Sequence, residues 1–404
     1  MKILFITQVF YPDTVAASQH LWDLAVHLKN NGHKVTCFTS LFSYESKDKQ
    51  YSKFEIQDGI EIYRMNQSKL GKSNILFRVV DYLTFNINIS FKLLFLNKKE
   101  YDLIIGTTAP PLLSFITLLI AQTKNIPFHY WVMDLQPELS IASGLIKKES
   151  IAARFLTLIG NYCIHNSTRL YSLDRFMTSY LISKGGNPSS VHTIPIWPVV
   201  DDIYLGGREE NPFRIENSFG DKIVVMYSGN HAYVHPLDTL LNSAKKLKND
   251  NRFLFVFVGG GVRRKDVSNF IEKYSLSNIR QLPFQPRNNI HLSLGSADIQ
   301  VVIMGEGLVG FTHPNKIYGA LFVSKPIIYI GPKSSHITDI INNLPGNISI
   351  EHGDSSKLTD DLLEFAELRK DERMIIGNAN RLYATINFAP LALKNNMLQV
   401  IESY

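Results

Sequence analysis

The sequence is poor in the features that mark several common classes of protein. It has only two cysteines, Cys37 and Cys163, which are too few for a disulfide framework and are typical of a reducing cytosol. Cys37 lies in an apolar run and is interpreted as a small buried hydrophobe. No group of Cys and His has the spacing of zinc ligands. These absences exclude a disulfide-rich secreted domain and a structural zinc module.

Long apolar runs and paired acidic metal ligands are also missing. Lys2 and the run Ile3–Ile6 resemble the start of a signal peptide, but the run is too short and polar residues follow at once. No segment approaches the ~18 consecutive apolar residues of a transmembrane helix. There is no Asp-x-Asp pair that would hold a metal ion on a diphosphate. We therefore expect neither a cleaved leader nor a membrane span, and no metal or other cofactor.

The size and charge of the chain narrow the remaining classes. Its 404 residues are too many for one ordinary domain and comfortable for two, and 45% hydrophobic with 19% charged residues is a globular composition. The net charge of +6 suggests anionic partners: nucleic acid, a membrane surface or a sugar nucleotide. No basic run is interleaved with aromatics on a recognisable nucleic-acid module, so a nucleic-acid partner is not expected.

The first half of the chain alternates apolar runs with helical patterns. After a loop at Gln8–Ser18, apolar residues recur at helical spacing over Gln19–Asn30, and Gly32 is the expected C-cap. Buried strands are predicted at Lys2–Thr7, Val35–Thr39, Leu103–Gly106, Phe128–Met133 and Arg169–Ser172, an exposed or edge strand at Ile60–Met65, and a covering helix at Leu112–Ala121. This order predicts a parallel, doubly wound α/β sheet.

The second half repeats the pattern after a proline-rich linker. Ile194–Pro198 cannot form a central strand, so it is interpreted as the boundary between domains. Strands are predicted at Ile223–Tyr227, Phe253–Val258, Asn278–Leu282, Ile299–Met304 and Pro326–Ile330. Helices are predicted at Leu237–Leu247 and from about Pro314 to Val323. The predicted fold is therefore α/β, with two Rossmann-like domains that face each other across a cleft, residues 1–195 and 196–387.

The stretch from Ala297 to Gly331 contains the residues with the clearest chemistry. Glu306 follows a predicted strand, and Lys316 falls in the first turn of the next helix. Ligands of open α/β sheets bind at this edge. A cation disfavours a helix N-terminus unless an anion such as phosphate binds the same exposed N–H groups. The alternative is that the glycines near Glu306 serve a turn and Lys316 is a solvated charge.

Glycines end several strands of the second half. Gly229-Asn230 follows one strand, Gly259-Gly260-Gly261 follows the next with Arg263 just beyond, and Gly305, Gly307 and Gly310 surround Glu306. Glycine lets backbone amides approach a phosphate, and the carboxyl ends of parallel strands share one edge. Three such loops at matching positions favour nucleotide binding over turns alone.

These segments, in their order and spacing, resemble the retaining GT-B glycosyltransferases of family 4, and most of all a WbuB-like bacterial branch that builds O-antigen, capsule and exopolysaccharide. The resemblance extends over nearly the whole chain. It rests on Lys2–Thr7, Asn31–Val35, Thr107–Pro111, Asp134–Glu138, Tyr227–Asn230, Val258–Gly261 and Pro314-Asn315-Lys316. It implies metal-independent transfer of a sugar from a nucleotide donor with retention of configuration, an acceptor-binding first domain and a donor-binding second domain. It also implies that the terminal segment 388–404, helical at about Pro390–Glu402, crosses back to the first domain.

The resemblance assigns roles to individual residues. Glu306 corresponds to the first Glu of the family's E-x7-E signature, which binds donor-sugar hydroxyls, and Lys316 lies near the diphosphate. The second Glu, which usually holds the ribose, has no counterpart. The predicted catalytic residues are Asp134, Glu306 and Lys316; the donor-binding residues are Gly229, Asn230, His235, Gly260, Arg263, Phe284, Gly307, Leu308, Val309 and Asn315; the first-domain loop residues are Ala16, Ala17 and Glu138.

Asp134 is the candidate for orienting the acceptor or the donor sugar, because it ends a strand at the edge of the first domain. Its alternative interpretation is a helix cap or a loop residue. Two other functions share this architecture: a sugar-nucleotide 2-epimerase, which binds the same donor, and a non-enzymatic sugar-nucleotide-binding regulator. The donor base and sugar are not fixed by the sequence, although the branch suggests UDP with an N-acetylated or deoxy sugar.

A basic, aromatic segment between Lys69 and Glu100 suggests where the acceptor is met. Its basic residues are Lys69, Lys72, Arg78, Lys92, Lys98 and Lys99, and its apolar residues include Phe77, Tyr82, Leu83, Phe85, Ile89, Phe91, Leu94 and Phe95. Such a segment lies in the bilayer interface rather than across it. We therefore expect a polyprenyl-diphosphate-linked acceptor and a cytoplasmic protein held peripherally at the inner membrane face. The alternative is that the aromatics only cover the sheet.

Overall fold

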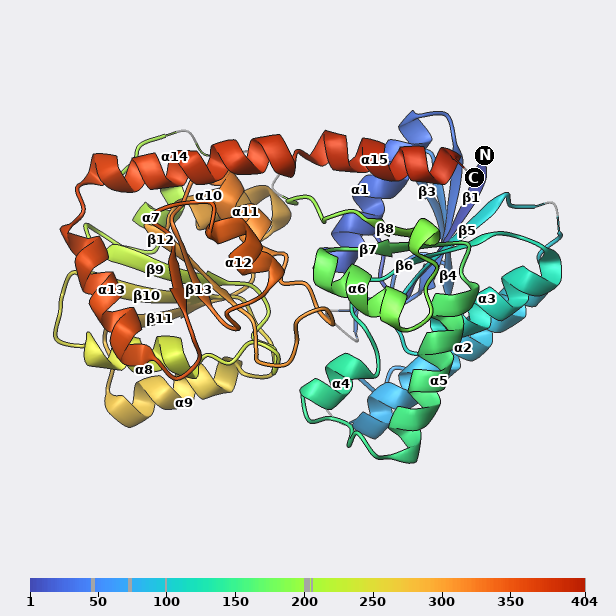
Figure 1. The fold of residues 1–404 in the computed structure, drawn as a ribbon, viewed down its shortest axis with the longest axis horizontal. Helices are drawn as coiled ribbons and strands as arrows, with labels where there is room; N and C mark the ends of the chain where they lie inside the picture. The colour runs from blue at the N-terminus through green and yellow to red at the C-terminus, as the bar shows by residue number, and fades with distance from the viewer. Residues whose placement is uncertain (45–47, 72–74, 99, 200–203, 205, 404) are drawn as a thin grey trace. The chain divides into compact units, whose positions relative to one another are not determined.

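The computed structural model of the chain describes residues 1–44, 48–71, 75–98, 100–199, 204 and 206–403. The backbone divides into two compact units (Figure 1). The first unit comprises Met1–Pro195, Gly310–His313 and Leu391–Tyr404, and the second comprises Ile196–Val309 and Pro314–Pro390. Lys72 and Lys99 of the predicted basic segment lie outside the described residues.

The first unit is built on an eight-stranded sheet with the order β3-β4-β2-β1-β5-β6-β7-β8, parallel except for the β3–β4 hairpin. Its strands are β1 (Lys2–Ile6), β2 (Lys34–Ser40), β3 (Phe54–Gln57), β4 (Ile60–Met65), β5 (Leu103–Thr107), β6 (Phe128–Trp131), β7 (Arg169–Ser172) and β8 (Val191–Thr193). Apart from Lys2 at the start of β1, the strands β1, β5 and β6 are fully buried, as their apolar composition predicts.

Helices cover both faces of this sheet. They are α1 (Ala16–Asn30), α2 (Ile75–Leu94), α3 (Leu113–Lys124), α4 (Glu138–Ala142), α5 (Ile151–Asn166), α6 (Arg175–Ser183), the 3₁₀ turn η1 (Pro188–Ser190) and the C-terminal α15 (Pro390–Glu402). α3 contacts both α2 and α5 (Figure 1). α15 buries Leu393, Met397 and Ile401, and its Glu402 carboxylate lies 3.0 Å from His33 Nε2, so the end of the chain packs on the first unit.

The second unit is built on a six-stranded parallel sheet with the order β11-β10-β9-β12-β13-β14. Its strands are β9 (Ile223–Ser228), β10 (Phe253–Val258), β11 (Ile279–Leu282), β12 (Ile299–Ile303), β13 (Ile327–Ile330) and β14 (Ile348–Ile350). Its helices are α7 (Pro212–Glu216), α8 (Asp238–Lys246), α9 (Arg264–Tyr274), η2 (Arg287–Asn289), α10 (Ile290–Gly295), α11 (Lys316–Phe322), α12 (His336–Ile341), α13 (Ser355–Glu367) and α14 (Lys370–Asn387).

The core of the second unit lies on both faces of this sheet. Val225 and Tyr227 of β9 belong to one apolar cluster, whereas Val224 and Met226 belong to another. Successive side chains of a strand point to opposite faces, so a strand buried on both sides is apolar throughout. The two sheets, parallel apart from the β3–β4 hairpin, confirm the predicted fold class of two Rossmann-like domains.

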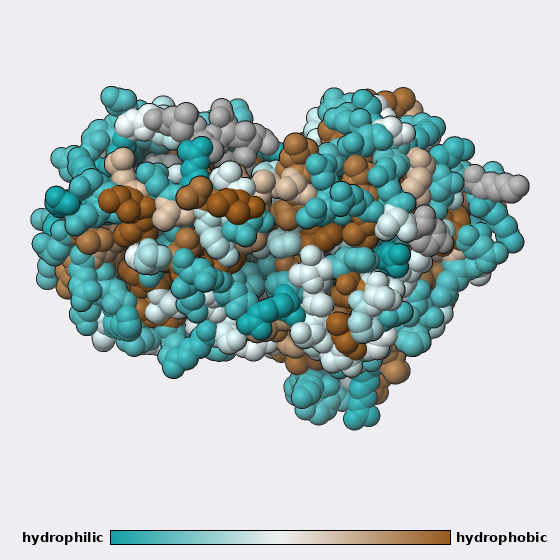
Figure 2. All heavy atoms as spheres, turned by 45° about the horizontal axis from the view of Figure 1, so that its top comes forward, coloured by the Kyte–Doolittle hydropathy of each residue, from teal (hydrophilic) through white to brown (hydrophobic). Residues whose placement is uncertain are grey.

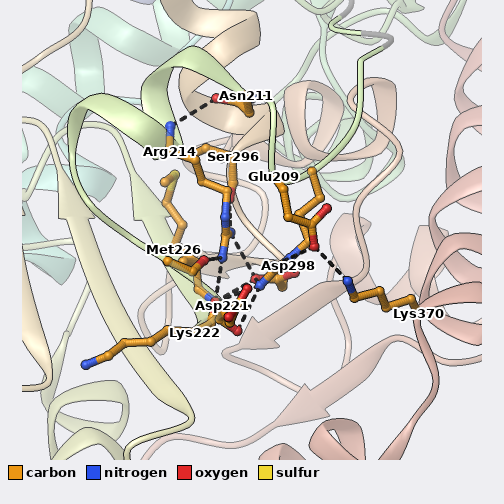
Figure 3. A network of polar contacts seen from close by, with 12 residues as sticks. Glu209, Asn211, Arg214, Asp221, Lys222, Met226, Ser296, Asp298 and Lys370 are labelled. Atoms are coloured by element: carbon orange, nitrogen blue, oxygen red, sulfur yellow. Dashed lines mark hydrogen bonds and ion pairs between the residues drawn. The ribbon is translucent and has the colours of Figure 1, made fainter.

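A buried ionic network ties α7 to the amino-end edge of this sheet (Figure 3). The Asp298 carboxylate accepts hydrogen bonds from Arg208 Nε at 2.6 Å, from Arg214 at 3.2 Å and from the Val224 N–H at 2.8 Å. Burial opposes ionisation of Asp298, but Arg208 and Arg214 lower the pKa of its carboxyl below the ordinary value. The network lies at the edge opposite to the carboxyl ends of the strands, so we interpret it as structural.

Several predicted boundaries need correction. Gln8–Ser18 is not entirely loop, because α1 begins at Ala16. Ile60–Met65 is a strand but not an edge strand, because β3 pairs with it through a turn at Asp58 and Gly59, both with positive φ. The helix predicted from Pro314 begins only at Lys316. Tyr318 N donates to Asn315 O, three residues back, so a tight turn at Asn315 precedes the helix.

The surface is mixed in character. On the face that Figure 2 shows, apolar areas are separated by hydrophilic ones. Large exposed apolar side chains are frequent on three helices, namely α2, α5 and α14. Within the described ranges, no helix is both long and apolar enough to cross a bilayer.

Candidate active site

The order of strands in the second unit reverses between β9 and β12. The chain runs outward from β9 through β10 to β11, and then returns to β12 on the other side of β9. Ligands of open α/β sheets bind beside the carboxyl ends of the strands at such a reversal. Gly229 follows β9 and Glu306 follows β12. The sheet therefore brings these two predicted residues to the same edge, and the Glu306 side chain is exposed there.

The loops after β9 and β10 approach each other more closely than side chains permit. Gly259 has φ +129°, and a Cβ atom on it would lie 2.1 Å from the Gly229 carbonyl oxygen. Gly261 has φ +126°, and its Cβ would lie 2.3 Å from Asn230 Oδ1 and 2.8 Å from the His231 oxygen. Both the dihedrals and the space require glycine at these positions. The predicted glycine loops thus form one tightly packed backbone surface.

Lys316 extends across this surface. A Cβ atom added to Gly229 would lie 2.3 Å from the Lys316 Cε atom. The Lys316 Nζ atom is 5.3 Å from the centre of the Tyr227 ring. Burial lowers the pKa of the Lys316 ammonium to about 8. Among the described residues no carboxylate forms an ion pair with it. A desolvated cation without a counter-ion, beside glycine loops, is suited to bind an anionic group.

Two buried histidines lie in the same loop. His231 donates its N–H to the Gly260 oxygen at 2.7 Å, and its Nδ1 atom is 3.1 Å from the same oxygen. Burial lowers the pKa of His231, and burial together with Lys316 lowers the pKa of His235 well below its ordinary value. His235, predicted to bind the donor, is therefore neutral, so a contact with an anion would be a hydrogen bond and not an ion pair. Lys316 is left to supply the positive charge.

Arg263 is held by carboxylates of its own unit. Its guanidinium lies 2.7 Å from Asp266 and 3.2 Å from Asp238. Its neighbour Arg264 donates to the Gly259 oxygen at 3.0 Å and so supports the loop backbone. The charge of Arg263 is already balanced in the free protein, and the geometry favours a supporting role for it over direct contact with an anion.

The remaining predicted donor-binding residues lie in the adjacent loops. The Phe284 ring is 58% exposed and lies beside Gly260, where a Cβ would be 3.0 Å from it. Gly307 has φ +70° and is exposed, whereas the Leu308 side chain is buried and leaves only its backbone for a ligand. Val309 is half-buried. Asn315 is the N-cap of α11, but its side chain makes no capping hydrogen bond.

Asp134 follows β6 in the first unit. Its Oδ1 atom accepts a hydrogen bond from Thr312 Oγ1 at 2.7 Å, and its N–H donates to Thr108 Oγ1 at 3.2 Å. The segment Gly310–His313 belongs to the same unit, where Phe311 O also accepts from the Leu135 N–H. Burial raises the pKa of the Asp134 carboxyl, against the lowering effect of the Thr312 hydroxyl. Asp134 is thus a positioned carboxylate and not a helix cap.

The other first-unit candidates have different surroundings. Ala16 and Ala17 are the first two residues of α1 rather than part of an open loop. Glu138 begins α4 and accepts a hydrogen bond from the Tyr180 hydroxyl. In the free protein the Glu138 carboxylate is therefore already engaged by a side chain of its own unit.

Sequence reasoning missed several residues of these sites. Tyr227 lies beneath the Lys316 ammonium, His231 links the β9 and β10 loops, and Thr312 holds Asp134. Tyr227 and His231 adjoin a predicted glycine loop and could have been found from that position. Nothing in the local pattern places Thr312 beside a residue 178 positions earlier.

The chain resembles known proteins along most of its length. Residues 208–382 match the family described as Glycosyl transferases group 1. The probable glycosyltransferase WbjE of Pseudomonas aeruginosa is 24% identical over 71% of this chain and 70% of its own length. The putative colanic acid biosynthesis glycosyl transferase WcaI of Escherichia coli (strain K12) is 20% identical over 86% of this chain and 87% of its own.

The fold also matches solved structures. The crystal structure of Anabaena HepE in complex with UDP and glucose superposes with a TM-score of 0.76, at 13% identity, over 100% of both chains. That likeness establishes the GT-B fold. The chain thus combines this fold with a second unit that is similar, over residues 208–382, to the family described as Glycosyl transferases group 1.

Proposed function

We propose that the protein is a retaining, metal-independent glycosyltransferase of family 4, in the WbuB-like branch. It moves a sugar from a nucleotide-diphosphate donor, a UDP-sugar with an N-acetylated or deoxy sugar, to a polyprenyl-diphosphate-linked saccharide in surface polysaccharide biosynthesis, as in O-antigen or capsule. The names of WbjE and WcaI and the UDP and glucose bound to HepE support this direction. The observation that carries it is the unpaired Lys316 ammonium lying across Gly229.

The first requirement of such a reaction is stabilisation of the leaving group. When the bond between the anomeric carbon and the β-phosphate oxygen breaks, negative charge builds up on the diphosphate. The N–H groups of Gly229 and Gly259 already donate to Val258 O and Leu282 O. Lys316 and the N–H groups of Gly260 and Gly261 are fixed in position before the reaction, so they stabilise that charge without reorganisation. The neutral His231 and His235 add hydrogen bonds without adding charge.

The donor sugar and base need separate contacts. Glu306 is exposed at the end of β12, and we assign it to the sugar hydroxyls, with the backbone of Gly307 to Val309 against the same sugar. The exposed Phe284 ring beside Gly260 is suited to stack on the base. The signature's second Glu is absent, so the ribose depends on other groups of this edge.

The acceptor hydroxyl attacks the anomeric carbon from the face of the leaving group, which retains the configuration. The new bond joins the acceptor oxygen to the anomeric carbon, and the acceptor proton passes to the departing β-phosphate oxygen. No protein nucleophile is needed in this scheme. Asp134, which the Thr312 hydroxyl holds in place, orients the acceptor or the donor sugar.

A lipid-linked acceptor requires the enzyme to meet a membrane, and α2 offers a surface for it. The inner side of α2 buries Phe85, Ile89 and Leu93 in the core. Its opposite side carries exposed apolar residues at helical spacing, here called the outer stripe: Leu76, Leu83, Ile87, Phe91 and Leu94. A helix that is apolar on both sides is suited to an apolar environment outside the protein as well as inside.

α5 carries a second exposed apolar stripe in the same unit. It exposes Ile151, Phe155 and Leu158 at the same helical spacing, with exposed fractions from 55% to 87%. Exposed Lys147, Lys148 and Arg154 adjoin them, and α3 contacts both α2 and α5. Apolar stripes bordered by basic residues favour insertion into the interface of an anionic membrane. We accordingly propose peripheral attachment at the cytoplasmic membrane face.

The test is a transfer assay with a synthetic prenyl-diphosphate-linked N-acetylglucosamine acceptor and a panel of labelled nucleotide sugars. We expect one donor to yield product with the anomeric configuration of the donor, read by NMR, and no loss of rate with EDTA. Lys316→Met and Glu306→Gln should each lower the rate by about a hundredfold, and neither should lower the temperature of thermal unfolding. Donor that is epimerised without transfer, inverted product, or wild-type rates in both variants would contradict the proposal.

A further inference from the structure

The first unit contains a polar pocket that the predicted site residues do not include. It has a volume of about 210 Å³ and lies at the carboxyl ends of β1, β2 and β4. Gln8 follows β1, Ser40 ends β2 and Gln67 follows β4, while Arg78 and Tyr82 of α2 form its side. The volume is below the range of ~300–1,000 Å³ of sites that enclose a whole small molecule. A pocket of this size accommodates a head group rather than a complete saccharide.

The charged groups of the pocket leave an excess of positive charge. Asp81 is its one carboxylate among the described lining residues, and it is satisfied by the neighbouring loop. The Asp81 oxygens accept from Ser68 Oγ at 2.5 Å and from the N–H groups of Leu70 and Gly71 at 3.1 and 2.9 Å. Lys69 and Arg78 are the two cations, and no carboxylate of the described chain pairs with Arg78.

Lys69 has only a weak partner. Its Nζ atom lies 4.1 Å from the centre of the Phe42 ring and 3.4 Å from Gln50 Oε1. Neither contact neutralises the ammonium. Lys69 and Arg78 thus stand against the single carboxylate of Asp81, and neither cation forms an ion pair with a described carboxylate, so the pocket keeps a net positive charge.

Neutral hydrogen-bond donors surround these charges. Gln8 Nε2 donates to Gln67 Oε1 at 3.1 Å, which leaves the Gln67 amide nitrogen to donate elsewhere. Burial raises the pKa of the Tyr44 hydroxyl, and that of Tyr82 to about 12, with Arg78 acting in the opposite direction on both. Both hydroxyls therefore keep their protons near neutral pH, and the Tyr82 hydroxyl can donate to an anion.

The pocket is continuous with the apolar surface of α2. Arg78 lies in the first turn of α2, and the exposed Leu76 and Phe77 precede it directly. Leu76 begins the outer stripe. A ligand whose anionic head lies beside Arg78 can thus extend an apolar chain along the stripe without crossing polar surface.

We propose that this pocket binds the diphosphate head group of the prenyl-linked acceptor, with Arg78 and Lys69 contacting the phosphates and the prenyl chain leaving along the outer stripe of α2. The inference rests on the proposed function for the identity of the acceptor. It adds to that function a lipid-diphosphate site in the first unit, separate from the Lys316 site of the second unit.

The probes are geranyl diphosphate, inorganic pyrophosphate and geraniol, titrated calorimetrically into the full chain and its variants. We expect geranyl diphosphate to bind, pyrophosphate to bind at least tenfold more weakly, and geraniol not to bind. Arg78→Gln should weaken geranyl diphosphate binding by about tenfold or more, the usual effect of losing a charge-assisted contact, and leave UDP binding unchanged. Lys316→Met should weaken UDP binding and leave geranyl diphosphate binding unchanged. Arg154→Gln, which removes the same charge from α5 outside the pocket, should affect neither.

The outcomes separate this inference from the proposed function. Loss of UDP binding with retained, Arg78-dependent geranyl diphosphate binding would sink the function and leave the lipid site. Geranyl diphosphate binding that is indifferent to Arg78→Gln, or equally reduced by Arg154→Gln, would overturn the site. If pyrophosphate bound as tightly as geranyl diphosphate, the pocket would be a site for a free anion. If geraniol bound as tightly, the diphosphate would contribute nothing to binding. Either result would overturn the proposed site. Lys69→Gln, a change at an exposed residue, tests the same expectation if Arg78→Gln does not fold.

Discussion

The side chain of Lys316 crosses the backbone of Gly229 so closely that a Cβ atom on Gly229 would lie 2.3 Å from the Lys316 Cε atom. Gly229 follows β9, and Lys316 begins α11, the helix that comes after β12 in the chain. Their contact therefore lies beside the two strands between which the sheet order reverses. The glycine leaves room for the ammonium at the edge where a diphosphate is expected. This contact predicts the effect of a single methyl group.

Gly229→Ala should displace Lys316 and lower transfer by about tenfold to a hundredfold. The added methyl group overlaps the end of the flexible Lys316 side chain, so that side chain should move while the protein stays folded. The φ of Gly229, +133°, is unfavourable for alanine and adds backbone strain. Steady-state transfer and thermal unfolding measure the two effects. Gly353→Ala is the control, because Gly353 has φ +90° with no atom near its Cβ position. If both variants lose activity equally, backbone strain and not Lys316 is responsible.

The binding of UDP should depend on pH through Lys316. Burial lowers the pKa of this ammonium to about 8, so the free protein loses its positive charge as pH rises through that value. UDP affinity should then fall by up to about tenfold per pH unit above pH ~8. Titration calorimetry from about pH 7 to about pH 9.5 measures it. Lys316→Met should bind weakly with no step, and a wild-type affinity that stays level over this range would contradict the assignment.

The same group makes a stability prediction of opposite sense. The folded pKa lies below the ordinary value of 10.5, so between about pH 8 and 10.5 the unfolded chain binds more protons than the folded one. The contribution of Lys316 to the free energy of unfolding therefore rises with pH over that window. Urea unfolding of the wild type and of Lys316→Met at several pH values should differ in slope in this direction.

Asp298→Ala should destabilise the second unit by about 3–5 kcal/mol, because it leaves Arg208 and Arg214 without their shared carboxylate in a buried site. Urea unfolding measures the change. Glu367→Ala breaks the exposed ion pair with Arg252 and should cost less than about 1 kcal/mol. Since Asp298 has a lowered folded pKa, the wild-type advantage should disappear as pH falls below about 4. Equal losses in the two variants would refute the role of burial.

Liposome flotation should report on the outer stripe of α2 and on Phe95, which follows the helix directly. The protein should float with anionic vesicles at low salt, less at high salt, and less again when Phe91 and Phe95 are replaced by serine, because both rings are at least 60% exposed. Met374→Ser with Ile386→Ser on α14 is the matched control, since these apolar residues are similarly exposed in the second unit. A wild-type protein that stays at the bottom with anionic vesicles at low salt contradicts the membrane assignment.

The strands were predictable because both sheets are buried on two faces. Phe253–Val258 matches β10 residue for residue, since an unbroken apolar run of this length has few other stable uses. Arg169–Ser172 also matches β7, although only Leu170 and Tyr171 in it are apolar. β3 was missed because its exposed residues at Phe54 and Ile56 carry no burial pattern, although Asp58-Gly59 is a hairpin signal. The sequence also does not reveal that a single methyl at Gly229 meets Lys316.

The candidate site was predictable only where topology decides position. Gly229, Glu306 and Lys316 meet one edge because parallel strands align their carboxyl ends. Other features depend on packing between distant segments. These are the ion pairs of Arg263 with Asp238 and Asp266, the hydrogen bond between Thr312 and Asp134, and the exposed apolar residues of α2 and α5. The basic and aromatic residues between Lys69 and Glu100 indicated a segment for the bilayer interface, but not which of its aromatics face outward.

The central claim is that Lys316 and the glycine loops of the second unit hold the diphosphate of a nucleotide-sugar donor. Calorimetric titration of the full chain with UDP, GDP, ADP and TDP, each against wild type and Lys316→Met, tests it most directly. We predict that one of these, UDP, binds the wild type and that its affinity falls by about tenfold or more in the variant. Absence of binding by every nucleotide, or equal binding to both proteins, would contradict the account.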